Sequence, residues 1–435
     1  SGRIQKCVAA MHPANFIRGQ WKWLPLFKYI DVPRAVTHSS FSEMKLTERR
    51  AIVSPSFRIA SDYLLEANTK EWVSIDYEGT SYITCLGVGW NPSEACCVPL
   101  NRVGSSSYWN AEEEVILWKL WCALLQNPKV KKIAQNASYE WIKSWLHGIY
   151  PNPLGIDTMH AHHCLFPYGG GVSDEWTKRK RDIDNPGHGL ALITSQYTDQ
   201  PFYKDDGRHW RPEHGQEAFW RYNALDVMVT FEAGMKMRDE LHKVGLWEVY
   251  EREYRECLET ALRMEWYGIK IDVERRAAVR AETERDLKAD LETLEQSIKR
   301  KVIAKNTTKG TKPSKDVLNL ASPAQVLAFI KERGYAVTLN RKTGRPTVDK
   351  DAMNALAIKH DDESLRLILE VGRKQDFIDK VLSVKLDSEN NIHCHWRLGG
   401  TNGTRRSSTE SILESGTNLQ NLNRTGPARS LFLPG

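Results

Sequence analysis

The chain has 435 residues, of which 41% are hydrophobic and 27% are charged, and its formal net charge is +6. This length allows about three domains of roughly 150 residues each, and this composition is ordinary for a soluble globular protein. No apolar run approaches the roughly 18 residues that span a bilayer. The eight cysteines contain no CxxC pair, which predicts reduced thiols in a cytoplasm. A modest positive charge is compatible with nucleic-acid binding, so local clusters of Lys and Arg must show whether the protein binds nucleic acid.

The first 55 residues form an N-terminal segment with a short motif of its own. Residues 7–18 contain His12 and Pro13, and a Trp-rich stretch with Asp31 follows. This pattern resembles the closing motif of uracil-DNA glycosylases, in which a His-Pro precedes a short helix and a later Asp. A glycosylase must flip a base and supply a water-activating acid, and those motifs would lie upstream of residue 1. We therefore expect residues 1–55 to be a remnant of such a domain and His12 to be structural.

Residues 72–79 are a short apolar run that ends in two acids. Asp76 and Glu78 are two positions apart, so in a strand they project from one face, while Ile75 and Tyr77 project from the other. Two carboxylates on one face repel each other and raise one pKa, and a divalent cation in a cleft removes this cost. A solvated strand edge is the alternative explanation for this stretch taken alone.

The segments that follow predict a mixed sheet flanked by helices. Strands are predicted at residues 82–90 and 95–100 with turns between them, so the sheet begins as an antiparallel meander. A helix follows with Asn110 as its N-cap and three glutamates in its first turns. A strand at 132–134 and a helix from Ser138 then alternate. This order predicts an α/β fold of the ribonuclease H-like kind.

Polar residues recur at two later places in this domain. Residues 135–140 place Glu140 at the start of a helix. Tyr222 and Asp226 are spaced i, i+4 in a helix predicted over about residues 216–243, so the phenol and the carboxylate share one face. Together with the acids of residues 72–79, this pattern resembles the proofreading 3′-5′ exonuclease domain of family A DNA polymerases, phage polymerases in particular. The residues that frame these motifs agree with the family as well: Asn136, Asp157-Thr-Met159, His188-Gly-Leu190 and Tyr203-Lys204.

The resemblance implies phosphodiester hydrolysis with two metal ions, which stabilise the attacking and the leaving oxygen. Mg²⁺ prefers carboxylate ligands, and Mn²⁺ can substitute for it. By the resemblance, Tyr222 orients the attacking water and Asn136 contacts DNA. The expected metal ligands, by the same resemblance, are Asp76, Glu78, Glu140 and Asp226.

Two positions depart from the family pattern. The family has Asp where this chain has Glu140, which is longer by one methylene, and Thr where it has Gly79. The longer Glu140 side chain predicts a site that still works but less efficiently.

Two further polar clusters lie in the same domain. His160, His162, His163 and Cys164 are close in sequence, but no second ligand group stands at a zinc-like spacing, so we expect no metal there. A glycine run and the basic residues 178–181 predict a mobile loop, either solvated or in contact with DNA.

The following region resembles the thumb of the same polymerases. Residues 258–272 match the segment that joins the exonuclease and polymerase domains, and a long charged helix is predicted from about residue 273 to residue 303. The stretch 299–315 contains no acid, which predicts a stripe that grips duplex phosphates; a solvated tip is the alternative. The DNA contacts expected in this stripe are Lys299, Arg300, Lys301, Lys305, Lys309 and Lys312.

Residues 401–435 resemble the entrance to the polymerase palm, where an arginine and polar residues hold the primer-template. Thr404 stands where relatives have Gly. The palm and fingers motifs are absent from the chain, so we expect polymerisation to need a missing C-terminal portion or a second chain. The DNA contacts implied here are Arg405, Ser407, Asn418, Gln420 and Asn421.

The sequence thus predicts four parts: residues 1–55, an exonuclease domain at 56–245, a mainly helical thumb at 246–400 and the start of a palm at 401–435. We expect proofreading hydrolysis of 3′-terminal nucleotides, with single-stranded 3′ ends and primer-template DNA as partners, in the cytoplasm of a bacterial host cell. A DNA-binding scaffold with an impaired exonuclease site is the alternative. A stand-alone ribonuclease is a third reading, against which the palm-entrance residues argue.

Overall fold

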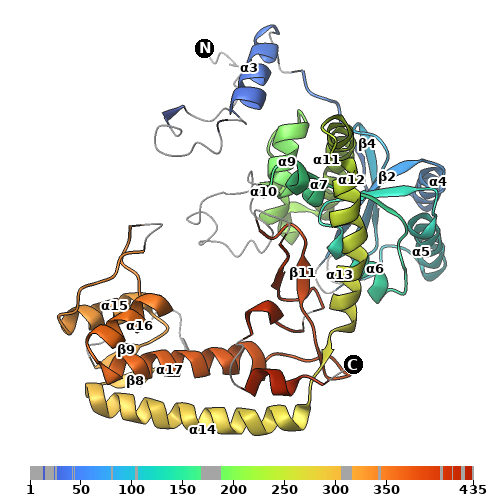
Figure 1. The fold of residues 1–435 in the computed structure, drawn as a ribbon. Helices are drawn as coiled ribbons and strands as arrows, with labels where there is room; N and C mark the ends of the chain where they lie inside the picture. The colour runs from blue at the N-terminus through green and yellow to red at the C-terminus, as the bar shows by residue number, and fades with distance from the viewer. Residues whose placement is uncertain are drawn as a thin grey trace. The chain divides into compact units, whose positions relative to one another are not determined.

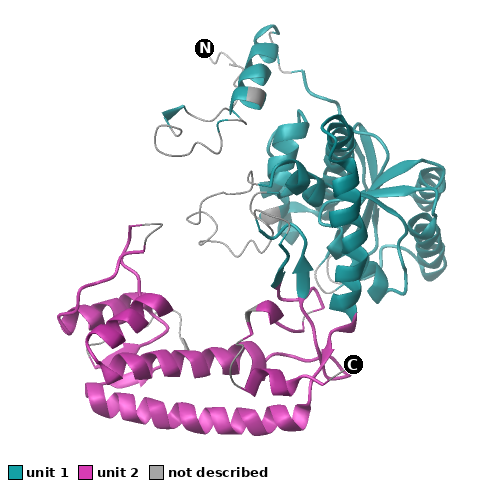
Figure 2. Ribbon diagram, viewed as in Figure 1, with its two compact units in different colours: residues 1–266, 395–408 teal, residues 267–394, 409–435 magenta. Residues whose placement is uncertain are grey.

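The chain consists of two compact units in a computed structural model (Figure 2). One unit contains residues 1–266 and 395–408, and the other contains residues 267–394 and 409–435. The structure describes residues 13–14, 24, 27–41, 43, 45–79, 82–102, 106–167, 188–304, 316–340, 344–401, 405–413, 415–422 and 427–433. Among these residues no helix is both long and apolar enough to cross a membrane. The expectations for His12, residues 178–181, Lys305, Lys309, Lys312 and Thr404 lie outside the described residues.

A six-stranded mixed sheet is the centre of the first unit. Its strands are β1 (Arg50–Ile52), β2 (Trp72–Glu78), β3 (Cys85–Gly89), β4 (Glu94–Pro99), β5 (Lys131–Ala134) and β6 (Leu154–Asp157). They lie in the order β1-β4-β3-β2-β5-β6. The predicted antiparallel meander is confirmed, because β3 pairs antiparallel with both β2 and β4. The pairs β2 with β5, β5 with β6 and β1 with β4 are parallel.

Helices cover both faces of this sheet, so the predicted mixed sheet with flanking helices is also confirmed (Figure 1). The helices of the unit are α3 (Val32–Ser39), α4 (Phe57–Ala67), α5 (Ala111–Gln126), α6 (Ser138–Leu146), α7 (Thr158–Leu165), α9 (Leu190–Tyr197), α10 (Lys204–Arg208), α11 (Gln216–Lys243), α12 (Trp247–Tyr250) and α13 (Glu256–Tyr267). Shorter turns are η2 (Phe27–Asp31), η3 (Pro212–His214) and η4 (Glu251–Arg255). Asn110 caps α5 as predicted, in a reciprocal capping box with Glu113.

Helix α11 lies directly on strands β2 to β5 and has the bounds that the sequence predicts. Its apolar face packs on the sheet, where Val227 and Met228 meet Cys85 and Cys97. Gly87 on β3 permits this close approach, since a Cβ there would lie 2.6 Å from Cγ2 of Val227. The polar residues of the same helix face are therefore held firmly against β2.

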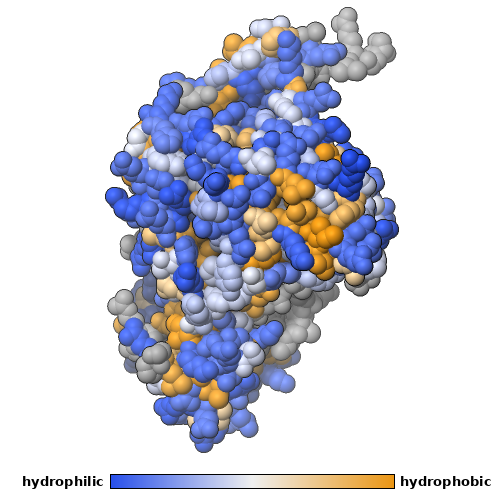
Figure 3. All heavy atoms as spheres, turned by 90° about the vertical axis from the view of Figure 1, so that its right-hand side faces the viewer, coloured by the Kyte–Doolittle hydropathy of each residue, from blue (hydrophilic) through white to orange (hydrophobic). Residues whose placement is uncertain are grey.

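The side of the first unit that α4 and α5 form carries exposed apolar side chains. Figure 3 shows apolar residues gathered on the side where α4 and α5 lie. The exposed large apolar residues of these two helices are Ile59, Leu65, Val115 and Ile116.

Residues 45–50 tie the N-terminal segment to the rest of the first unit. The guanidinium of Arg49 is almost fully buried and contacts Asp199 at 3.2 Å and Glu232 at 2.6 Å. Asp199 also accepts a 2.6 Å hydrogen bond from the backbone N–H of Thr47. Thr47 and Arg49 thus fasten the chain to α11 and to the loop after α9.

A second stretch of chain returns to the first unit after residue 394. It contains β11 (His395–Arg397) and leads into β12 (Ser407–Thr409), with which β11 forms a two-stranded sheet. Nδ1 of His395 lies 2.7 Å from Oε2 of the buried Glu265. Nε2 of His163 donates to the carbonyl of Thr401 at 2.7 Å, so its Nδ1 accepts from the hydroxyl of Tyr254. Both buried groups of the domain therefore find their partners in a distant part of the sequence.

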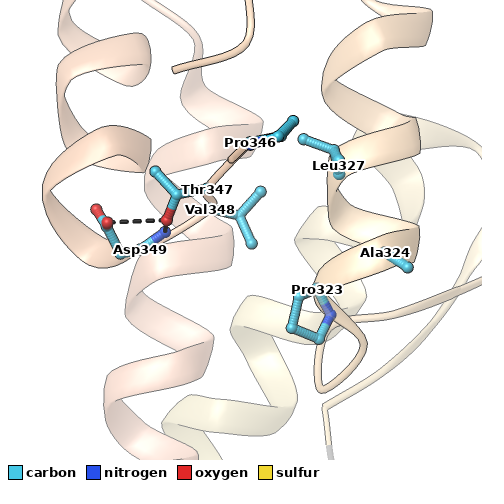
Figure 4. A pocket seen from close by; sticks show the side chains of 7 residues that line it. All are labelled: Pro323, Ala324, Leu327, Pro346, Thr347, Val348 and Asp349. Carbon is cyan, nitrogen blue, oxygen red and sulfur yellow. Dashed lines mark hydrogen bonds between the residues drawn. The ribbon is translucent and has the colours of Figure 1, made fainter. Parts of the chain in front are cut away.

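The second unit is mainly helical, as predicted. Its helices are α14 (Val273–Ile298), α15 (Pro323–Glu332), α16 (Lys350–Lys359) and α17 (Glu363–Phe377), with the shorter turns η5 (Ile378–Leu382), η6 (Leu419–Asn421) and η7 (Pro427–Leu431). Its strands pair as β7 (Ile269–Lys270) with β10 (Asn391–Ile392) and β8 (Lys301–Ile303) with β9 (Val317–Asn319). An open pocket of about 450 Å³ lies beside α15 (Figure 4). It is lined by Pro323, Ala324, Leu327 and residues 346–349.

The predicted helix over residues 273–303 is wrong in its last turn. Helix α14 ends at Ile298 because Lys299 adopts a left-handed backbone conformation, with φ at +52°. Residues 301–303 form β8 instead, and the buried side chain of Val302 packs with Leu294 and Phe329. Burial of a β-branched side chain in a strand outweighs the helix preference of the charged residues around it.

Candidate active site

Three carboxylates from two elements meet at one point. Asp76 and Glu78 lie on β2, and Asp226 lies on α11, which packs across that strand. One carboxylate oxygen from each residue lies within 4.8 Å of the other two. Within the described ranges, this is the group of His, Cys, Asp and Glu side chains that has metal-binding geometry.

The pKa values of Asp76 and Glu78 rise because these acids lie in the interior close to other carboxylates. Burial and then the charge of Asp226 raise the pKa of Asp76 to about 8. Burial and then the charge of Asp76 raise the pKa of Glu78 well above its ordinary value. Lys204 opposes both shifts. Oxygen ligands of this kind suit a hard divalent cation such as Mg²⁺, whose charge would remove the repulsion.

Glu140 lies beside this trio but is not part of it. The residue is on α6, only 2% of its surface is exposed, and its Oε2 has no hydrogen-bond partner among the described residues. Burial and then the charge of Asp76 raise the pKa of Glu140 well above its ordinary value. A buried carboxylate oxygen without a partner destabilises the fold, so Glu140 fits the site of a bound cation.

Both oxygens of Asp226 are held by residues that precede or begin α10. The hydroxyl of Tyr203 donates to Oδ1, and the ammonium of Lys204 donates to Oδ2 at 2.6 Å. The sequence pattern places Tyr203 and Lys204 only beside the predicted motifs and predicts no role for them. Their link to Asp226 depends on the path of the chain between α9 and α11, for which no local pattern is a signal.

Tyr222 lies one turn before Asp226 on α11, and its ring is half-buried. The ring is 4.5 Å from the ammonium of Lys204 and packs against Gly207, where a Cβ would lie 2.5 Å from Cζ of the ring. Burial and then the charge of Asp226 raise the pKa of Tyr222. The phenol therefore keeps its proton at neutral pH and can donate a hydrogen bond.

The sequence pattern did not point to Asn223 on α11 as a residue of the site. Asn223 is completely buried, and its Nδ2 donates to Oδ2 of Asp76 at 2.7 Å. The available signal was an Asn on the buried face of a predicted helix, since such a polar group needs a partner.

Asn136, predicted to contact DNA, is half-buried and adopts a left-handed conformation with φ at +62°. Its backbone N–H donates to Asp157, which also caps α7.

Residues 54–242 match the family model of the 3′-5′ exonuclease of DNA polymerase A. These residues are a 3′-5′ exonuclease domain. The chain is similar to DNA polymerase I of Synechocystis sp., with 24% identity over 360 residues that cover 80% of this chain and 32% of the relative. Its fold is similar to that of the polymerase domain of Pol1 from M. smegmatis, solved with a DNA primer-template and dNTP. That likeness has a TM-score of 0.58 and 18% identity, and it covers 88% of this chain and 57% of the other.

The chain spans about a third of the length of this curated relative, as the 32% coverage shows, and 57% of the solved chain. The phage type and the glycosylase-like character of residues 1–55 stay predictions. The residues predicted to bind DNA outside the exonuclease domain lie at several places. Lys299 and Lys301 are exposed, whereas Arg300 forms a 2.8 Å ion pair with Glu332 of α15. Arg405 and Gln420 are exposed, and Ser407 and Asn418 are half-buried. For Asn421, which lies in η6, only the backbone is described.

Proposed function

We propose that this chain removes nucleotides from 3′ ends of DNA, as the proofreading part of a family A DNA polymerase of the phage type. The observation that carries the proposal is the meeting of Asp76, Glu78 and Asp226 within 4.8 Å in an exonuclease domain. A site of this kind needs one cation or more to be stable with all its carboxylates ionised.

Two Mg²⁺ ions, or Mn²⁺ in their place, would stabilise the attacking and the leaving oxygen when bound. Asp76, Glu78 and Asp226 would hold them, and the unpartnered Oε2 of Glu140 supports this residue as a further ligand. Tyr222, which keeps its proton, would orient the attacking water by hydrogen bonding. Asn136 would contact the DNA end.

The remaining contacts with DNA are proposed for the second unit and the palm entrance. Lysines and arginines near the end of α14 would neutralise duplex phosphates without reading bases. Polymerisation would need palm and fingers from further residues or from a second chain. The proposed primer-template contacts are Lys299, Arg300, Lys301, Lys305, Lys309, Lys312, Arg405, Ser407, Asn418, Gln420 and Asn421.

The direct test is hydrolysis of a 5′-labelled single-stranded oligonucleotide in Mg²⁺. We expect products that shorten from the 3′ end, and we expect Asp76→Ala to remove this activity. Asp62→Ala is the matched control, because Asp62 is an exposed acid on α4 with a side chain 67% accessible to solvent. Equal rates for Asp76→Ala and the parent would show that the activity belongs to another site or another protein.

A DNA-binding scaffold is the second candidate, and it is favoured by Glu140, whose side chain is one methylene longer than the Asp of the family pattern. This function predicts that the parent chain binds the oligonucleotide but leaves it intact in both Mg²⁺ and Mn²⁺. Shortening in either metal excludes the scaffold reading.

A further inference from the structure

The ammonium of Lys204 and a bound metal ion would compete for the same position beside the carboxylate of Asp226. Its ammonium lies 2.6 Å from Oδ2 of Asp226, while Oδ1 of the same carboxylate accepts from Tyr203. The side chain of Asp226 is 6% exposed and that of Lys204 is 20% exposed, so water screens this ion pair little. Each oxygen of Asp226 thus already accepts a hydrogen bond, so a metal ion at this carboxylate must share an oxygen with one of these donors or replace it.

The charges at the site support an exchange. Asp226 lies in the trio with Asp76 and Glu78, so the positive charge of Lys204 offsets part of a dense negative cluster. The ammonium of Lys204, 2.6 Å from Oδ2 of Asp226, would repel a divalent ion bound to the same carboxylate. Coulomb repulsion of that size lowers the affinity for the ion by on the order of tenfold even with strong screening.

We propose that Lys204 is a positioning residue of the exonuclease site, an internal counter-cation that holds Asp226 until a divalent ion displaces it. This inference rests on the proposed function. In the metal-free enzyme the ammonium keeps Asp226 pointed at Asp76 and Glu78, so the ligands are already arranged when the ion arrives. The same charge keeps the affinity for the ion lower than three carboxylates alone would give.

The displaced ammonium stays inside the site because its backbone is fixed. Lys204 is the first residue of α10, and Gly207 of that helix packs closely against the ring of Tyr222. The face of this ring, 4.5 Å from Nζ, can hold a cation. An anionic phosphate of the DNA end, next to the phenol that orients water, is then the natural new partner of Lys204. The residue would exchange a carboxylate for the phosphate that is being hydrolysed.

The test measures Mn²⁺ binding to the whole chain without DNA, by isothermal titration calorimetry at one pH. Lys204→Met, which keeps the length but removes the charge, should bind Mn²⁺ about tenfold more tightly than the parent. Lys204→Arg, which keeps the charge, should bind like the parent. The matched control is Lys236→Met, since Lys236 forms a similar 2.6 Å pair with Glu232 on α11 away from the trio. Equal or weaker binding by Lys204→Met overturns the inference, and Lys204→Gln serves if the Met variant does not fold.

Thermal unfolding gives a second measurement. In EDTA, Lys204→Met should unfold at a lower temperature than the parent, and saturating Mn²⁺ should remove most of the difference. A difference that persists in Mn²⁺ would make Lys204 an ordinary structural ion-pair residue. In single-turnover hydrolysis at saturating Mn²⁺, the same variant should be slower, because the phosphate has lost a cation. Tighter metal binding with an unchanged rate would exclude the phosphate as the new partner.

Asp76→Ala separates a failure of this inference from a failure of the proposed function. If Mn²⁺ binding persists in Asp76→Ala, the carboxylate trio is not the metal site and the proposed function falls with it. If binding needs Asp76 but is the same in Lys204→Met and the parent, only the role of Lys204 is wrong.

Discussion

The side-chain amide of Asn223 donates a 2.7 Å hydrogen bond to Oδ2 of Asp76. This bond joins α11 to β2 at the carboxylate trio, and no part of Asn223 is exposed. A buried donor aimed at a ligand oxygen fixes the direction of that oxygen, and partners of this kind are expected to matter nearly as much as the ligands.

Asn223→Ala should therefore slow single-turnover hydrolysis by about 10-fold to 100-fold. It should also lower the free energy of unfolding by about 1–3 kcal/mol, because Asp76 loses its donor in the interior. Urea unfolding and the oligonucleotide assay measure the two effects. Asn354→Ala, at an exposed position of α16, is the control and should change neither. Parent-like hydrolysis by Asn223→Ala would show that Asp76 needs no support from α11.

Gly207→Ala should disturb Tyr222 without touching a carboxylate. The added methyl group would lie 2.5 Å from Cζ of the ring, so the ring or α10 must move. We expect a loss of about 1–3 kcal/mol in stability, typical of an overpacked contact, and a lower rate of hydrolysis. Gly372→Ala is the matched control, because it lies in α17 with no atom within 4 Å of the new Cβ. That control should be more stable by about 0.5–1 kcal/mol, as for Gly to Ala in a helix interior. A Gly207→Ala protein with parent stability and rate would mean that the ring has room to shift.

The contribution of His162 to the stability of the first unit should be lost in mild acid. His162 is buried, with Nδ1 2.6 Å from Nδ1 of His188 and Nε2 bonded to Gln196, and burial lowers the pKa of His162 from 6.5 to about 4. Below pH 6.5 the unfolded chain binds a proton that the folded chain does not, so this stability is present above pH 6.5 and is lost as the pH falls towards 4. The slope should approach about 1.4 kcal/mol per pH unit for each such group.

Urea unfolding at several pH values, followed by Trp fluorescence, measures this slope. His162→Gln should reduce it, even if the variant is less stable at every pH. The same slope in His162→Gln and the parent would assign the acid sensitivity to other groups.

Glu140→Asp should raise the rate of hydrolysis in Mg²⁺. Mg²⁺ demands near-octahedral geometry with ligands at about 2.0 to 2.1 Å, so a carboxylate displaced by one methylene must bend back or bind through water. The gain should be smaller in Mn²⁺. Single-turnover hydrolysis by both proteins in each metal measures it. A slower Glu140→Asp enzyme in Mg²⁺ would show that the surrounding backbone is adapted to the longer side chain.

Local rules explain what the sequence could predict about this site. Period two along β2 puts Asp76 and Glu78 on one face, and the i, i+4 spacing puts Tyr222 and Asp226 one turn apart in a helix whose bounds were also predicted. These relations depend on a single element each, so a pattern of a few residues is enough to show them.

The relations that the sequence did not show depend on packing between elements. Lys204 reaches Asp226 only because α10 packs on the ring of Tyr222, and the two residues are 22 positions apart with no repeating pattern that links them. Arg300 belongs to a stretch without acids, yet Glu332 of α15 pairs with it in space. The misplaced end of α14 has the same origin, since the burial of Val302 decides it.

The return of residues 395–408 to the first unit affects how the protein can be cut into working pieces. A fragment that stops at residue 266 would lose the carbonyl of Thr401 and the imidazole of His395. His163 and Glu265 would then each lack a partner in the interior, at a cost of about 1–3 kcal/mol per unsatisfied group. The first unit is thus discontinuous in sequence, and a fragment that carries residues 395–408 on a linker should be more stable than one that stops at residue 266.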